Sequence, residues 1–160
     1  MAALKFVNEA KKYHDEEAMR DVLMYIMRPD KTPHGWICGA GVDMTDPAKS
    51  MKDIAQYYKK DFGVRVRHMI LSFEKDEVTS AGVPLYVAEK ICKKIGLIYQ
   101  TVCAVHEDTP DHPHIHIVFN PVSFVNGYKY HGDKQDYYGM IACVQRAVNS
   151  FGLGYVRIVK

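Results

Sequence analysis

The sequence predicts a single α+β domain of two layers, in which helices pack on one face of a central, mainly antiparallel β-sheet. The chain has 160 residues, of which 48% are hydrophobic, and this suffices for one domain with a sizeable core. Strand-like and helix-like segments follow one another without the strict alternation of a parallel α/β fold, and an Asn-Gly pair indicates a tight hairpin. This mixture favours an antiparallel sheet with helices packed on it.

Apolar alternation and short apolar runs bounded by turn residues predict the strands. Asn126-Gly127 lies among aromatic and β-branched residues and predicts a hairpin over 124–130. Residues 32–45 are rich in proline and glycine and are expected to form a loop or loose strands. The predicted strands cover residues 4–7, 67–73, 98–105, 113–122 and 155–159.

Apolar residues at helical spacing, together with start and stop signals, predict four helices. Asp15 is a suitable N-cap for the first helix, and Asp46-Pro47 is a strong start for the second because proline suits the first helical position. Gly96 and Gly152 mark the ends of the last two. The predicted helices cover residues 16–27, 47 to about 63, 83–95 and 136–151.

Composition narrows the class of protein. No apolar run is long enough to span a bilayer, so we expect a cytoplasmic protein without membrane insertion. A net charge of +2 does not by itself indicate a nucleic-acid partner. The cysteines lack CxxC spacing and are expected to be reduced thiols. They are Cys38, Cys92, Cys103 and Cys143.

Four of the eight histidines lie within residues 106–116. His114 and His116 are two residues apart, and in a strand such side chains project from the same face. His106 ends the preceding predicted strand, so pairing of the two strands would bring three imidazoles together and leave positions for water. This open arrangement suits a catalytic cation. We therefore predict that His106, His114 and His116 bind a metal ion.

Two neighbouring residues are interpreted differently. His112 precedes Pro113 in an acidic, proline-containing loop, so we interpret it as a solvated histidine, with metal ligation as the alternative. We expect Asp108 to accept a hydrogen bond from a ligand histidine and to set its tautomer, rather than to bind the ion.

This segment resembles the third motif of the plasmid and conjugative-transposon relaxases, which are mobilisation nucleases of the His-hydrophobic-His endonuclease class. In that family a His-x-Asp element precedes a His-x-His pair, with an asparagine four residues beyond. The matching residues are His106, Asp108, His114, His116 and Asn120.

Two further segments are similar to motifs of the same family. Residues 25–32 resemble the first motif, in which a helical tyrosine precedes a Pro-x-Lys-Thr turn. Residues 68–73 resemble the second, a strand ending in Leu-Ser-Phe. The order of the motifs agrees, and the resemblance extends over nearly the whole chain. Residues 109–112 depart from the pattern as an insertion in the third motif.

The resemblance implies strand-specific transesterification on single-stranded DNA at an origin of transfer. The Tyr25 hydroxyl would attack a phosphodiester, leaving a 5′-phosphotyrosine and a free 3′-OH, while Asp108 orients a histidine or assists proton transfer. The implied cofactor is Mg²⁺ or Mn²⁺, although three imidazoles would hold Zn²⁺, Ni²⁺ or Co²⁺ more tightly in a purified sample. The implied partners also include accessory relaxosome proteins and a coupling protein.

The nucleophile has alternatives. From the residues alone, Tyr25 occupies the apolar face of its helix and would be interpreted as a core residue. The resemblance assigns it as the nucleophile instead. The remaining candidates are Tyr13, the pairs Tyr57-Tyr58 and Tyr137-Tyr138, His14 and His34.

The DNA contacts are predicted from residue type. Lys31 and Ser72 lie in the resembling motifs and are expected to contact phosphates, whereas Tyr128-Lys129 combines a ring for base stacking with a cation for the backbone. We interpret His68 as a structural residue close to the site. Asn120 is expected to satisfy backbone groups at a strand end.

Two other functions remain as hypotheses. One is a three-histidine metal hydrolase that acts through bound hydroxide without a covalent intermediate, and the other is a single-stranded DNA-binding module that does not cleave. Residues 1–160 are expected to form one relaxase domain. Because the chain ends directly after a predicted strand, this domain also fits the N-terminal part of a longer protein.

Overall fold

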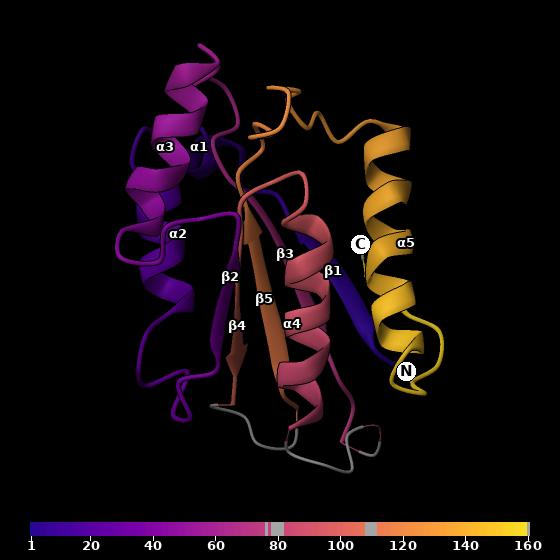
Figure 1. Ribbon diagram of the computed structural model, residues 1–160. Helices are drawn as coiled ribbons and strands as arrows, with labels where there is room; N and C mark the ends of the chain where they lie inside the picture. Colours follow the sequence, from indigo (N-terminus) through magenta and orange to yellow (C-terminus); the bar gives the residue numbers. More distant parts are fainter. Residues whose placement is uncertain (76, 78–81, 108–111, 160) are drawn as a thin grey trace.

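The computed structural model describes residues 1–75, 77, 82–107 and 112–159. In this part of the chain, six strands form one sheet in the order β2-β4-β5-β3-β1-β6 (Figure 1). All neighbouring strands are antiparallel except β1 and β6, which are parallel. The strands are β1 (Ala3–Val7), β2 (Ile37–Ala40), β3 (Arg67–Ser72), β4 (Thr101–His106), β5 (His114–Phe119) and β6 (Arg157–Val159).

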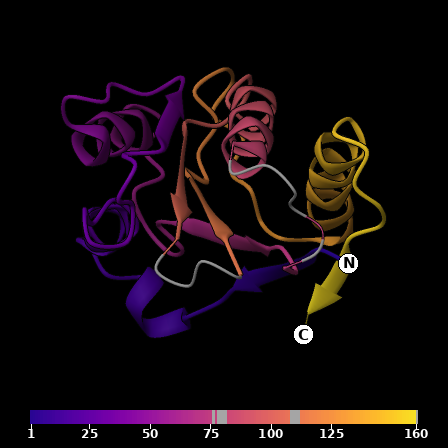
Figure 2. The ribbon, with the colours of Figure 1, turned by 90° about the horizontal axis from the view of Figure 1, so that it is seen from below.

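The helices lie on both faces of this sheet. Helices α4 and α5 cover one face, and the shorter helices α1 to α3 cover the other, as Figures 1 and 2 show. The predicted α+β class, with helices packed on a mainly antiparallel sheet, is confirmed, but the helices are divided between the two faces instead of sharing one. The helices are α1 (Ala10–Tyr13), α2 (Ala18–Ile26), α3 (Pro47–Tyr57), α4 (Val83–Ile95) and α5 (Lys134–Asn149).

Strand β4 lies between two apolar cores, and all six of its residues are buried. Cys103 and Val105 belong to the core beneath α4 and α5, whereas Val102 and Ala104 belong to the core beneath α2. Successive residues of a strand point to opposite faces, so a strand covered on both sides reads as a continuous apolar run. The run over 101–105 therefore already contained the signal for a second helical layer.

Most element boundaries agree with the sequence, with shifts of a few residues. Asp46 and Pro47 start α3 as predicted, and the Asp46 carboxylate accepts a hydrogen bond from the Lys49 backbone N–H at 3.2 Å. The helix was predicted to end near Gly63, and this prediction was wrong because α3 ends at Tyr57. Lys59 follows with a φ of 57°, a left-handed conformation that stops helix propagation.

Two local predictions need correction. The four-residue helix α1 falls where no helix was expected, because it is too short to show a helical apolar period. The hairpin predicted over 124–130 is a tight turn closed by a single bridge between Val122 and Lys129. Pro121 accepts a hydrogen bond from the Tyr130 N–H but has no N–H to donate, so the ladder cannot continue.

The segment 32–45, expected to be a loop or loose strands, contributes the short edge strand β2. Within the described part of the chain, no helix combines the length and apolar character that a bilayer-spanning segment requires.

Candidate functional site

The pairing of β4 with β5 brings three histidines together on the α2 face of the sheet. His106 lies directly opposite His114, and His116 lies opposite Ala104, the residue two positions before His106. One ligand atom of each histidine lies within 4.8 Å of the others. The convergence expected from the His-x-His spacing and the strand pairing is thus confirmed, and the group could hold a metal ion.

Hydrogen bonds to carbonyl groups set the tautomers of two of these rings. His106 Nε2 donates to the Ile26 carbonyl at 2.8 Å, at the C-terminal end of α2. His114 Nδ1 donates to the His112 carbonyl at 3.3 Å. Because a carbonyl only accepts, each imidazole is protonated at the bonded nitrogen and carries a lone pair on the other. Ligand histidines in metal sites are commonly fixed in this way.

His116 is held by a buried chain of side chains. Its Nδ1 is 2.8 Å from His68 Nε2, and His68 Nδ1 is 2.9 Å from the Tyr13 hydroxyl. All three residues are buried. If His116 keeps its proton on Nδ1, His68 accepts that proton's hydrogen bond and donates its own to the Tyr13 oxygen. His116 Nε2 then carries the lone pair.

His68 and His116 are both neutral at physiological pH. Burial, together with the nearby imidazoles His106, His68 and His114, lowers the pKa of His116 far below its usual range. Burial likewise lowers the pKa of His68 to about 4, with His106 contributing. A neutral imidazole is the form that binds a metal ion.

The donor set fits a cation. His116 Nε2 is buried and has no hydrogen-bond partner among the described residues, a costly state that a bound cation would relieve. His114 is only half-buried, so one side of the group is open to solvent. Three protein ligands with an open side are typical of a catalytic rather than a structural metal site.

Tyr25 lies beside this group. It occupies the last turn of α2 and is 44% exposed, so it is not the core residue that its helical position alone suggested. Its ring stands edge-on to those of His106 and His116, with centroid distances of 5.9 and 5.7 Å. Among the described tyrosines, Tyr25 is the one whose ring contacts these two histidines. Its catalytic role stays a prediction.

The other nucleophile candidates lie in different surroundings. Tyr13 is buried against His68, and Tyr57 is 76% exposed at the end of α3. His34 is stacked on Trp36, and its Nδ1 is 2.8 Å from the Glu107 Oε1. None of these rings contacts the three-histidine group in the described structure.

Ser72 lies next to the histidines. It pairs with His114 across β3 and β5, and the two line a cavity of about 350 Å³ together with His112 and Arg157. Lys31 is in the turn after α2, where its carbonyl accepts a hydrogen bond from the Glu107 N–H at 3.1 Å. Asp108, the predicted hydrogen-bond acceptor and proton-transfer residue, falls outside the described residues.

Tyr128 and Lys129 lie at the opposite end of the sheet, in the segment after β5 (orange in Figure 1). The Tyr128 hydroxyl donates to the Asp136 carboxylate at 3.1 Å. The Lys129 ammonium donates to the Phe62 carbonyl and stands 4.4 Å from the centre of the Phe62 ring. The structure therefore does not bring this pair together with the three histidines.

Asn120 acts as predicted. Its side-chain amide donates to the Met51 carbonyl and to the Gln100 side-chain oxygen, both at 2.9 Å. Its own oxygen accepts the Val122 N–H at 3.1 Å. Asn120 thus joins the end of β5 to α3 and has a structural role.

Residues 25–153 match the relaxase family described as MobA/VirD2-like, nuclease domain. The chain belongs to this family. The match begins at Tyr25 and includes the three histidines, so the group described above lies in a relaxase nuclease domain. No curated protein sequence shows significant similarity to the chain.

The residues behind His116 in this relaxase domain were predicted only in part from the sequence. Tyr13 entered only as an alternative nucleophile and His68 only as a nearby structural residue, yet they form the hydrogen-bonded chain behind His116. Tyr13 is 55 positions from His68, and His68 is 48 positions from His116, so no local motif joins them. Only the position of His68 on β3, on the same face as His116, offered a signal.

Proposed function

We propose that this relaxase domain nicks and rejoins single-stranded DNA at an origin of transfer through a covalent bond to Tyr25. The observation that carries the proposal is the position of Tyr25, which is exposed and edge-on to two of the three converging histidines. A nucleophile must reach its substrate from solvent and lie beside the group that activates the phosphate. Among the described residues, Tyr25 meets both requirements.

The proposed step conserves the number of phosphoester bonds. The Tyr25 oxygen forms a bond to phosphorus, and the bond between phosphorus and the 3′ oxygen of the preceding nucleotide breaks. The phenol loses its proton, and the departing 3′ oxygen becomes a 3′-OH. Because the ester is retained on Tyr25, the reverse attack by a 3′-OH rejoins the strand without another energy source. We propose that Asp108 assists this proton transfer or orients a histidine.

His106, His114 and His116 would hold a divalent ion, which we propose is Mg²⁺ or Mn²⁺ in function. When bound, this ion supplies polarisation of the scissile phosphate and neutralisation of developing negative charge. The chain's own contribution is orientation: the Ile26 and His112 carbonyls hold His106 and His114, and the His68 chain holds His116.

We propose that one DNA strand passes the cavity beside His114. Ser72 can donate a hydrogen bond to a phosphate oxygen, and the exposed Arg157 on the same cavity can pair with one. We propose that Lys31 contacts the backbone near Tyr25. Tyr128 and Lys129 would contact a more distant part of the strand at the far end of the sheet. Accessory relaxosome proteins and a coupling protein would complete the assembly in the cytoplasm.

A trapping experiment tests the nucleophile with random DNA, because such a library presents many different target sequences at once. The 160-residue chain is incubated with a random library of single-stranded DNA in Mn²⁺, and protein-linked strands are isolated under denaturing conditions and sequenced. We expect one enriched junction sequence and, after digestion, a peptide whose Tyr25 carries a nucleotide. Tyr25→Phe should reduce the adduct by roughly 10³-fold or more, because no other tyrosine ring of the described chain lies against His106 and His116.

Tyr57→Phe is the matched control, since Tyr57 is also an exposed helical tyrosine but lies away from the histidines. It should form the adduct at the wild-type rate. Undiminished adduct in Tyr25→Phe would overturn the assignment of the nucleophile. Metal-dependent cleavage without any adduct would favour a hydrolase, and salt-sensitive binding without cleavage would favour a DNA-binding module.

A further inference from the structure

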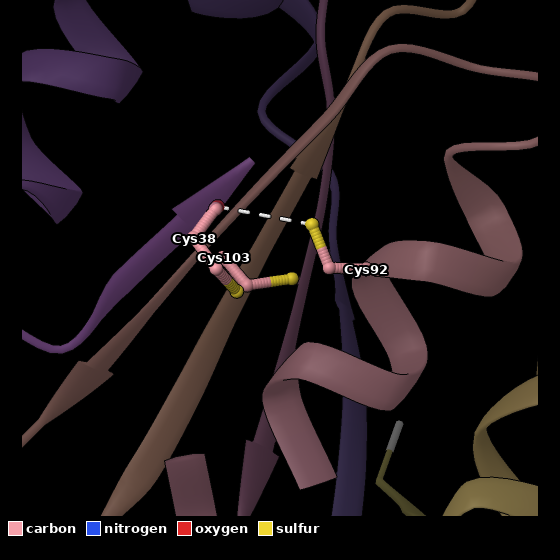
Figure 3. A group of neighbouring side chains, drawn as sticks. All are labelled: Cys38, Cys92 and Cys103. Atoms are coloured by element: carbon pink, nitrogen blue, oxygen red, sulfur yellow. Dashed lines mark hydrogen bonds between the residues drawn. The ribbon is translucent and has the colours of Figure 1, made fainter. Parts of the chain in front are cut away.

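Three cysteines that lie far apart in the sequence meet on the opposite face of β4. Cys38 lies on β2, Cys103 on β4 and Cys92 on α4, and their sulfur atoms are all within 4.8 Å of one another. Figure 3 shows Cys38 and Cys103 side by side on their strands, with Cys92 approaching from the helix. Three different elements thus direct their sulfurs at one point.

The packing of α4 on β2 produces this meeting. Cys38 and Cys103 are paired across the two strands and project toward α4. A Cβ atom added at Gly96, where α4 ends, would lie 2.4 Å from the Ala40 Cβ, so only glycine permits this close approach. Cys92, one turn earlier, then reaches the strands, and its thiol lies 3.7 Å from the Cys38 carbonyl and 3.6 Å from that of Thr101.

We propose that Cys38, Cys92 and Cys103 form a second metal site, which binds a thiophilic divalent cation such as Zn²⁺ through three thiolates and ties β2, β4 and α4 together. Zinc–sulfur bonds of about 2.3 Å place the sulfurs of one site about 4 Å apart. The sulfur atoms of the three cysteines lie at most 4.8 Å apart, so each sulfur–sulfur distance would have to shorten by less than about 1 Å. Thiolate ligands prefer zinc and similar soft ions to Mg²⁺ or Mn²⁺, so the ion proposed to work at the histidines would not displace the ion bound by the cysteines.

The electrostatics of the group agree with a bound cation. Hydrogen bonds from the Cys103 and Cys92 thiols lower the pKa of Cys38 to about 4. Burial, together with the bond to Cys38, raises the pKa of Cys103 well above its ordinary value. A divalent cation that replaces the thiol protons would offset two of the three thiolate charges.

A thiolate site here would have a structural purpose. β2 is a four-residue edge strand whose only strand neighbour in the described sheet is β4. An ion shared with Cys92 would hold this strand against α4 as well. Since Cys103 is three residues before His106 on β4, the same ion would also stiffen the strand that carries the first histidine.

Cadmium is the probe for the test, because a cadmium–thiolate bond has an ultraviolet charge-transfer band that cadmium–imidazole bonds lack. The metal-free full chain, reduced with a phosphine, is titrated with Cd²⁺. We expect the band to saturate at one ion per chain. Cys38→Ser should weaken binding at least tenfold, whereas Cys143→Ser, which alters a half-buried cysteine on α5, should match the wild type. Absence of the band, or equal behaviour of the two variants, would overturn the proposal.

Alkylation of the unaltered chain provides a test that no substitution can disturb. Cys38 and Cys143 are both half-buried, so both should react with iodoacetamide in the metal-free protein. Added Zn²⁺ should slow labelling of Cys38 at least tenfold and leave Cys143 unchanged, as read by peptide mass mapping. Equal rates of Cys38 labelling with and without Zn²⁺ would contradict the metal site. A peptide map in which the only modification is a disulfide between two of the three cysteines would contradict it as well.

Discussion

The two faces of β4 carry two groups of potential metal ligands that differ in construction and in cover. On one face, the histidines come from adjacent strands, and two of them are two residues apart in the sequence. On the other face, the cysteines come from two strands and a helix. The histidine group has the half-buried His114 and the exposed Tyr25 beside it, whereas α4 covers the cysteines.

This difference separates chemistry from structure within one sheet. Imidazoles bind a metal in their neutral form, and the buried His116 and His68 are neutral because burial lowers their pKa values. Thiols must lose protons to bind, which a buried site permits only when the cation replaces them. The half-buried His114 and the exposed Tyr25 open the histidine group to solvent, so we propose DNA chemistry for that face and stabilisation for the other.

The largest expected effect comes from removing one of the three histidines proposed as metal ligands. His116→Ala should lower the affinity for Mn²⁺ by roughly 100-fold or more and reduce nicking of the trapped DNA sequence in proportion. The cadmium–thiolate band should remain, because the cysteines lie on the other face of β4. Calorimetric titration measures the Mn²⁺ affinity, and ultraviolet titration with Cd²⁺ measures the cadmium–thiolate band. Loss of both signals in a folded variant would contradict independent groups.

The next effect concerns the chain behind His116. His68→Ala should lower the affinity for Mn²⁺ by about 10–100-fold, because His116 Nδ1–H loses its acceptor and the ring loses its orientation. His68→Gln should restore part of the affinity, since its amide oxygen accepts a hydrogen bond. Tyr13→Phe should lower the Mn²⁺ affinity less, because it removes the hydrogen bond between Tyr13 and His68, which does not involve His116 directly.

Circular dichroism at each titration point is the control for these three variants. A purely structural role for His68 would lower the melting temperature and leave the Mn²⁺ affinity of the folded fraction unchanged. Equal affinities for His68→Ala and His68→Gln would also speak against positioning through a hydrogen bond.

The smallest effect tests whether stability and metal binding can be separated. Asp46→Ala removes the N-cap of α3 and should lower the free energy of unfolding by about 1 kcal/mol, measured by urea denaturation. Helix α3 packs on the histidine face but supplies none of the described ligands, so Mn²⁺ and Cd²⁺ affinities should match the wild type. A changed Mn²⁺ affinity would show that α3 helps to shape the histidine group.

Local chemistry explains which parts of the fold were predictable. Asp46-Pro47 started a helix as expected, because a capping side chain and a fixed proline φ act within a few residues. The tight turn predicted at 124–130 forms, but its pairing is limited to one bridge because Pro121 cannot extend the ladder. The division of helices between two faces depended on which segments cover the sheet, and the turn signals carry no information about that.

The order of residues along the chain was enough to establish most element types, the placing of His114 and His116 on one strand face, and the family motifs that pointed to a relaxase. The reason is that helix and strand periodicities place residues two to four positions apart in a fixed relation. Tertiary packing established that Tyr25 is exposed beside the histidines, that Tyr13 and His68 stand behind His116, and that three distant cysteines converge. These relations depend on strand order, register and the docking of α2 and α4, which arise only when the whole chain packs.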